Sequence, residues 1–297
     1  LNKEKKENSF SVGDIYLGRV KKLMPSLNAA FVDIGYEKDA FLHYLDLGPQ
    51  VQSLLKFMKT TSSGSQSESL LNNFEIEPDI NKAGKIGQVL SQNMNIMVQI
   101  AKEPISTKGP RITSELSFAG RFVVLVPFSD IVSVSQKIKS SVERQRLKRL
   151  AQSIKPRNFG IIVRTVAEGK KVADLDADIQ DLCSRWESLH EMLKTAQPPT
   201  KILGEMNRTS TILRDLLNPN FNSIQVNDAS LAEEIKSYIR SIAPDQVEIV
   251  KLYKGKVPIF ENFGVDKQIK SLFGKTVTLS GGSYLVVEHT EALHVID

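Results

Sequence analysis

The chain of 297 residues is 41% hydrophobic and 25% charged, and its formal net charge is +5. This length exceeds that of most single domains, so we expect two or three domains with the ordinary composition of folded soluble protein. No apolar stretch reaches the ~18 residues of a transmembrane helix, and the single cysteine, Cys183, excludes an internal disulfide framework and a cysteine-based zinc cluster.

The start of the chain, "LNKEKKENSF", has neither an initiator Met nor the apolar core of a signal peptide. We therefore expect the natural start to lie upstream and the protein to be cytoplasmic, where a lone thiol stays reduced. The positive charge permits nucleic-acid binding, although many proteins this basic bind none.

Short strands separated by turns dominate the first hundred residues. Alternating or apolar stretches predict strands in "DIYLGRVKKL", "NAAFVDIG", "DAFLHYLDL" and "KIGQVLSQNMNIMVQIAKE". Between the last two lies "TTSSGSQSES", whose Ser/Thr-rich composition predicts a mobile surface insertion near 59–69. The pattern predicts a small β-barrel or sandwich over residues 1–110.

Helices and strands alternate in the rest of the chain. Residues 111–200 hold two apolar strands, a basic helix "SVERQRLKRLAQS" and a long helix that Pro198-Pro199 ends. Residues 201–275 hold further helices and strands, with a capping box expected at Ser230 and Glu233. Residues 276–297 read as strands only, so an α+β multidomain protein is predicted.

Two aromatic residues stand out in the predicted barrel. Phe31 and Phe41 lie on neighbouring strands, and basic residues that include Lys102 and Lys108 lie near them in the chain. Rings stack on bases and cations neutralise phosphates, so this pattern suits single-stranded RNA. The alternative is that both rings belong to the core and the lysines are ordinary solvated charges.

A candidate anion site follows the apolar strand "FGIIV". Arg164 offers a planar fork for phosphate oxygens, Thr165 adds a hydroxyl donor, and Gly120 would let a backbone amide approach the same anion. A structural salt bridge of Arg164 is the commoner explanation of such a pair, and the residues by themselves leave both open.

The chain closes on "TEALHVID", where a predicted strand carries the carboxylate of Asp297 at its tip, with Glu291 shortly before it. Metal-dependent phosphoryl transfer uses such carboxylates, but the site needs at least one more ligand. The histidines show no HExxH spacing, GxSxG is absent, and Cys183 has no identifiable partner, so nucleophilic catalysis lacks support.

Ordered landmarks over nearly the whole chain resemble the ribonuclease E/G family, in particular its ribonuclease G-like branch. The landmarks are "YLGRVKKLMPSLNAAFVDIGYEKDAFL", "VQIAKEPISTKGPRIT", "SFAGRFVVLVP", "GIIVRTVAEGK", "KLYKGKVPIF" and "SGGSYLVVEHTEALHVID". The resemblance implies an N-terminal, catalytic-half fragment with four parts. These are an OB-fold (S-one-type) RNA-binding barrel, a 5′-sensor domain at 111–200, an incomplete ribonuclease-H-like segment at 201–275 and the start of a deoxyribonuclease-I-like domain at 276–297.

The resemblance also implies roles for individual residues. Phe31 and Phe41 match aromatic residues that hold RNA, and Lys108 matches a basic position beside them. Four residues match the family's pocket for a 5′-monophosphate, which has no room for a triphosphate: Gly120, Val124, Arg164 and Thr165.

Asp297 matches the first of two aspartates that bind the catalytic metal ion, normally Mg²⁺, in a motif that continues as Asp, any residue, Asn. The resemblance thus implies an endoribonuclease that cleaves single-stranded RNA with a preference for 5′-monophosphorylated ends, and a complete protein that is a homo-oligomer. Because the second aspartate of the motif would lie beyond Asp297, we expect the 297 residues to bind RNA without cleaving it. The alternatives are a non-catalytic RNA-binding module and a scaffold with no role in RNA binding.

Overall fold

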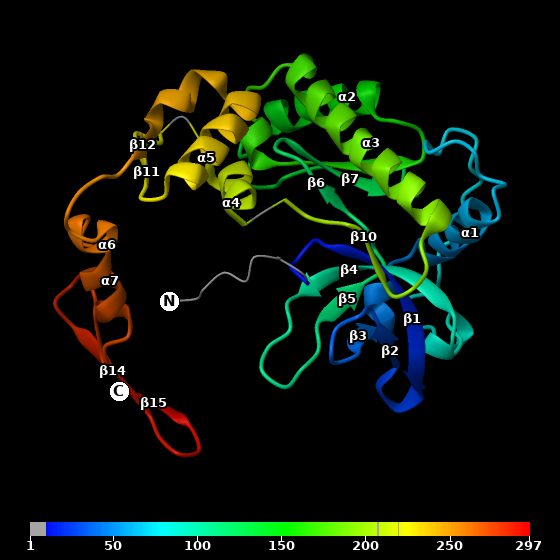
Figure 1. Cartoon of the computed structure of the whole chain (residues 1–297), viewed down its shortest axis with the longest axis horizontal. Coiled ribbons are helices and arrows are strands. Elements are labelled where there is room, and N and C mark those ends of the chain that lie inside the picture. Colours follow the sequence, from blue (N-terminus) through cyan, green and yellow to red (C-terminus); the bar gives the residue numbers. More distant parts are fainter. Residues whose placement is uncertain (1–9, 207, 219) are drawn as a thin grey trace. The chain divides into compact units, whose positions relative to one another are not determined.

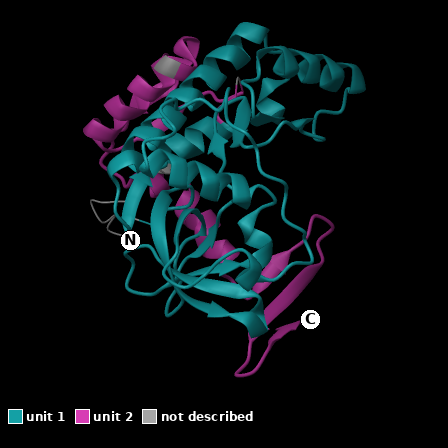
Figure 2. Ribbon diagram, turned by 90° about the vertical axis from the view of Figure 1, so that its right-hand side faces the viewer, with its two compact units in different colours: residues 1–216 teal, residues 217–297 magenta. Residues whose placement is uncertain are grey.

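The computed structural model describes residues 10–206, 208–218 and 220–297. The chain forms two compact units, residues 1–216 and residues 217–297, which Figure 2 shows in different colours. In the described ranges, no helix combines the length and the apolar character needed to cross a membrane.

Five strands of the first unit close a barrel in the order β1-β2-β3-β5-β4, because β4 pairs back onto β1. The strands are β1 (Ile15–Met24), β2 (Ala29–Asp33), β3 (Ala40–His43), β4 (Asn95–Lys102) and β5 (Arg111–Thr113). Among these five strands, only β3 and β5 pair in parallel, and β10 (Thr200–Leu203) pairs antiparallel with the start of β1. This closed, OB-like barrel confirms the barrel that the sequence predicts.

The insertion inside the barrel differs from the predicted mobile loop. Its residues 59–62 form the end of helix α1 (Val51–Ser62), and Thr61 is buried. The loop that follows is tied down by side chains of helix α3 (Val172–Thr195): Trp186 Nε1 donates to Ser69 O at 2.7 Å, and His190 Nε2 lies 3.3 Å from Gln66 O. The apolar face of α1, which the Ser/Thr-rich segment obscures in the sequence, explains the helix.

A second sheet has the strand order β6-β7-β9-β8. Its strands are β6 (Phe118–Ala119), β7 (Val123–Pro127), β8 (Val132–Val134) and β9 (Phe159–Val163). The alternate residues Val123, Leu125, Ile161 and Val163 are fully buried, and α2 (Ser141–Ile154) and α3 pack against the sheet (Figure 1). After β10, helix α4 (Arg208–Leu216) completes the unit.

One aromatic cluster joins the barrel insertion to the second sheet. Trp186 is fully buried, and its ring centroid lies 4.9 Å from that of Phe57 on α1. Three further rings stand edge-on to it at 5.7–5.8 Å: Phe118, Phe128 and Phe159. The first two predicted domains therefore share a hydrophobic core.

The second unit contains a parallel strand pair and an antiparallel sheet. Helix α5 (Ala229–Ile242) connects the parallel strands β11 (Ile224–Val226) and β12 (Val250–Leu252). Its N-cap is Asp228, which accepts a hydrogen bond from the Leu231 amide at 2.7 Å, so the capping box expected at Ser230 is wrong. Two short helices follow, α6 (Ile259–Asn262) and α7 (Val265–Leu272), and then the strands β13 (Thr276–Thr278), β14 (Tyr284–His289) and β15 (His294–Ile296).

The order of helices and strands agrees with the expected α+β class. The boundaries at 110, 200 and 275, together with the ribonuclease-H-like and deoxyribonuclease-I-like assignments, stay predictions.

Truncation of the shared aromatic centre tests how the first unit is held together. We expect Trp186→Ala to lower the free energy of unfolding by about 3–5 kcal/mol, because it leaves a cavity among four rings. Met192→Ala on the same helix is the control: this side chain is 46% exposed, and its loss should cost less than about 0.5 kcal/mol. Urea unfolding is followed by circular dichroism, since Trp186 is the single tryptophan. Equal midpoints for the two variants would contradict the prediction.

Candidate nucleic-acid interface

Phe31 and Phe41 are directly opposed on the antiparallel strands β2 and β3. Their ring centroids lie 5.8 Å apart at an interplanar angle of 67°, and both side chains are half-buried. The adjacent residues Ala30, Val32 and Leu42 are fully buried and fill the barrel. Strand alternation therefore turns both rings to the outer face, and the alternative that places them in the core does not hold.

A pocket of about 630 Å³ adjoins these rings. It is lined by Phe31, Lys38, Asp39, Phe41, Thr107, Lys108, Gly109 and Arg111. Lys108 is exposed in a tight turn that pairs with Ile105. Arg111 is held by a bidentate ion pair with Asp46 at 2.9 and 3.0 Å. The structure thus brings Lys108 beside the rings, and Arg111 is a neighbouring cation that the sequence reasoning missed.

Lys102 occupies a different place from Lys108. It is exposed at the end of β4, opposite Arg111 in the strand register, and it does not line the pocket. Gly109 lets the turn approach the barrel closely because it has no side chain: a Cβ there would lie 2.4 Å from the carbonyl oxygen of Asp39.

The second candidate region lies where β9 ends against the turn between β6 and β7. The Arg164 amide donates to Phe122 O at 2.8 Å, and its Nη1 donates to Gly120 O at 2.7 Å. Its Nη2 forms an ion pair with Asp215 Oδ1 at 2.8 Å. The salt bridge expected as the alternative for Arg164 is therefore present, and its partner comes from α4, about fifty residues away in the chain.

Gly120 does not offer its amide to an anion, as the sequence reasoning assumed. The amide donates to Val123 O at 2.9 Å, while the carbonyl receives Arg164. A Cβ on Gly120 would lie 2.4 Å from the Asp178 carboxylate. The glycine therefore makes room for Asp178 of α3.

Asp178 holds the turn itself. Its carboxylate accepts hydrogen bonds from the amides of Arg121, Phe122 and Val123 at 2.8–2.9 Å. Burial raises the pKa of Asp178, and these three hydrogen bonds oppose that rise. The three consecutive amides could bind an external anion, but the Asp178 carboxylate already accepts their hydrogen bonds.

Val124 and Thr165 lie on different elements near the end of β9, the strand that Arg164 follows. Val124 is half-buried and pairs with Ile162, which is 44% exposed, and alternation along β7 and β9 places both on the sheet face of Arg164. Thr165 is exposed, and its hydroxyl lies 3.0 Å from that of Ser135. The apolar pair and Arg164 therefore share one sheet face, and the Thr165 hydroxyl lies at the same strand end, beside Ser135.

The loop after Thr165 is anchored by α2. Glu143 Oε1 accepts from the Gly169 amide at 2.8 Å, and Arg146 donates to Lys170 O at 3.0 Å. Hydrogen bonds from Arg146 and Gly169 lower the pKa of Glu143 to about 2. The anchored loop holds Lys170 Nζ 5.5 Å from the Phe122 ring centroid, which adds a cation near the turn.

Asp297 is exposed and continues the pairing of β15 with β14. Its amide donates to Val286 O at 2.9 Å, and its carbonyl accepts from Val286 N at 2.7 Å. Glu291 lies in the turn between β14 and β15, at the opposite end of that hairpin. Among the described residues, no group of three or more His, Cys, Asp or Glu side chains could hold a metal ion.

Mg²⁺ requires an octahedral set of oxygen ligands, and one exposed carboxylate does not supply that set. The described residues therefore do not by themselves fit a magnesium site.

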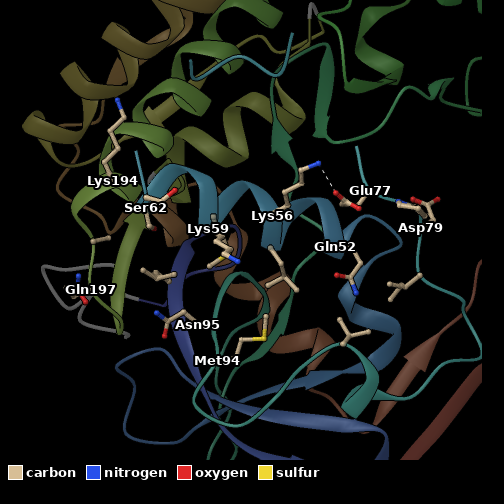
Figure 3. A pocket seen from close by; sticks show the side chains of 18 residues that line it. Gln52, Lys56, Lys59, Ser62, Glu77, Asp79, Met94, Asn95, Lys194 and Gln197 are labelled. Atoms are coloured by element: carbon tan, nitrogen blue, oxygen red, sulfur yellow. Dashed lines mark ion pairs between the residues drawn. The ribbon is translucent and has the colours of Figure 1, made fainter. Parts of the chain in front are cut away.

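A larger groove of about 1110 Å³ lies between α1, the ends of β1 and β4, and the end of α3. Figure 3 shows the side chains that line it, with Lys56 paired to Glu77 at 2.7 Å across one wall. Lys59, Lys194 and several amides complete its polar rim. The sequence-predicted site residues lie outside this groove.

Comparisons with known proteins identify relatives of this chain. Residues 117–297 match the model of the Ribonuclease E/G family. Over 286 residues the chain is 33% identical to Ribonuclease G of Haemophilus influenzae and 32% identical to Ribonuclease G of Escherichia coli, covering 96% of this chain and 54% and 55% of those proteins. It is also 33% identical over 290 residues to Ribonuclease E of Nostoc sp., covering 96% of this chain and 38% of that protein. The chain thus spans about half, or less, of the length of these relatives.

Proposed function

Because the chain belongs to the ribonuclease E/G family, we propose that it is the RNA-binding part of an endoribonuclease that cleaves single-stranded RNA and prefers 5′-monophosphorylated ends. The observation that carries this proposal is the outward pair of Phe31 and Phe41 beside Lys108. A cytoplasmic location and a homo-oligomeric complete protein are proposed from the family alone.

The barrel surface has the chemistry of a single-strand site. Two half-exposed rings offer stacking faces to unpaired bases, and the cations at the rim of the 630 Å³ pocket neutralise phosphates. Stacking is available only to unpaired bases, since bases inside a duplex are already stacked. The surface therefore favours single-stranded RNA.

The Arg164 region has the chemistry of a site for the 5′ end. The guanidinium is a donor fork suited to phosphate oxygens, and the exposed Thr165 hydroxyl can donate to the same group. Val124 and Ile162 supply an apolar surface on the same face for the terminal nucleoside. Charge and hydrogen bonding then favour a terminal monophosphate over a hydroxyl.

We propose that Asp297 is one carboxylate ligand of a catalytic Mg²⁺. Such an ion stabilises the charge on the phosphoryl group and activates water when bound. The described residues offer no complete ligand set for this ion. The same observation favours a second candidate function for these 297 residues, that of a non-catalytic RNA-binding module.

Removal of one barrel ring tests the proposed RNA surface. Phe41→Ala should weaken binding of a 5′-hydroxyl single-stranded RNA about tenfold, the size expected for one lost base–ring stack. Leu45→Ala, which removes a side chain that is 65% exposed on the same unit, should leave the affinity unchanged. Fluorescence anisotropy at fixed salt measures both. Equal affinity of the Phe41 variant and the parent chain would remove the stacking role.

Paired RNAs of one sequence test the proposed 5′-end site. The parent chain should bind the 5′-monophosphate form about tenfold more tightly than the 5′-hydroxyl form, because a charge-assisted pair is added. Arg164→Ala should bring this ratio to about one. Arg149→Ala, which removes an exposed arginine of α2, should preserve the ratio. A ratio of one for the parent chain, unchanged by Arg164→Ala, would eliminate the site.

The incomplete ligand set leads to an expectation for the chain itself. With Mg²⁺ and a 5′-monophosphate RNA, the purified 297 residues should show no cleavage above background, because one carboxylate does not hold the ion productively. Gel analysis of the RNA measures this, with Asp297→Ala as the matched control. Robust Mg²⁺-dependent cleavage that Asp297→Ala abolishes would refute it.

A further inference from the structure

A carboxylate of α4 lies between two guanidinium groups at the edge of the second sheet. Asp215 Oδ1 is 2.8 Å from Arg164 Nη2 and 3.0 Å from Arg214 Nε. The Arg214 side chain is only 7% exposed, that of Arg164 is 22% exposed, and that of Asp215 is 37% exposed. Asp215 therefore bridges a buried arginine to the arginine at the proposed 5′-end site.

The two arginines contact consecutive carbonyl groups of one turn. Arg214 Nη1 donates to Ala119 O at 2.9 Å, and Arg164 Nη1 donates to Gly120 O at 2.7 Å. Arg214 also pairs with Glu205 at 3.0 Å. These contacts fix α4 against the turn, so the position of the Asp215 carboxylate is set by the buried Arg214.

The charge of Asp215 suits this role. Burial alone would raise its pKa, but hydrogen bonds and attraction from Arg214 and Arg164 outweigh burial, and the pKa lies below the ordinary value. The carboxylate is thus ionised at neutral pH, where its hydrogen bonds to both guanidinium groups are charge-assisted.

The contacts of Arg164 leave the guanidinium able to take a ligand. An arginine has five N–H donors, and Gly120 O and Asp215 Oδ1 each occupy one terminal nitrogen of Arg164. A side chain held at both terminal nitrogens has already lost much of its rotamer freedom, so a phosphate would bind without that ordering cost. A free arginine at the same place would bind more weakly.

We propose that Asp215 is a positioning residue for Arg164, holding the guanidinium against the Gly120 carbonyl so that its remaining donors are presented to an RNA 5′-phosphate; this inference rests on the proposed function. It assigns specificity for the 5′ end to α4 as well as to the strand end that carries Arg164. Asp215 acts through Arg164 and does not itself contact the RNA.

The test compares the preference of variants of the 297-residue chain for 5′-monophosphate over 5′-hydroxyl RNA of one sequence. Asp215→Ala and Asp215→Ser each remove the carboxylate, and we expect each to lower the preference about tenfold, the effect of losing one charge-assisted hydrogen bond. Asp215→Asn keeps an acceptor at Oδ1 and should retain the preference to within about threefold. Glu233→Ala, which removes an exposed carboxylate paired to Lys236, should match the parent chain.

Rescue by asparagine separates positioning from a general loss of structure, because the readout is a ratio between two RNAs bound by the same preparation. If both truncations keep the preference, Asp215 does not position Arg164 and the inference is overturned. If both increase it, Asp215 competes with the phosphate for Arg164, and the inference is overturned as well. If the parent chain has no preference, the proposed 5′-end function fails and the inference fails with it. Loss of the preference in the truncations but not in Asp215→Asn supports the inference.

Discussion

The burial of Trp186 is the contact on which the first unit depends. Its ring lies among aromatic residues of α1, the second sheet and the segment after β7, and its indole nitrogen holds the loop that leads away from α1. Apolar burial is non-directional and brings these segments together. The hydrogen bond from Trp186 to the Ser69 carbonyl then fixes the position of the loop. A barrel and a sheet from different parts of the chain thereby become one compact unit.

Both sheets carry candidate binding residues on their outer faces, because separate apolar clusters fill the barrel and cover the inner face of the second sheet. Phe31 and Phe41 point out of the barrel because the residues beside them fill it. Val124, Ile162 and Arg164 share the outer face of the second sheet for the same reason. The two-residue period of a strand makes this division unavoidable once one face is buried.

Carboxylates from helices determine what the strand ends can bind. Asp178 fills the amides of the turn after β6, so an external anion does not find donors there. Asp215 pairs with Arg164 through one terminal nitrogen. Arg164 can therefore form the predicted salt bridge and still bind a phosphate, as the sequence also predicts. A structural ion pair can orient an arginine and still leave donors for a ligand.

The sequence by itself determined the α+β class, the order of helices and strands and the family, because these follow from local periodicity and from ordered motifs. It also indicated Phe31, Phe41, Arg164 and Thr165 as candidate binding residues. Closure of the barrel rests on the long-range pairing of β4 with β1. Only the tertiary structure decided that residues 59–62 are helical, that Gly120 makes room for Asp178, and that Asp215 meets Arg164. Each of these depends on a partner more than forty residues away along the chain or on the packing of α1, and no local pattern encodes such a contact.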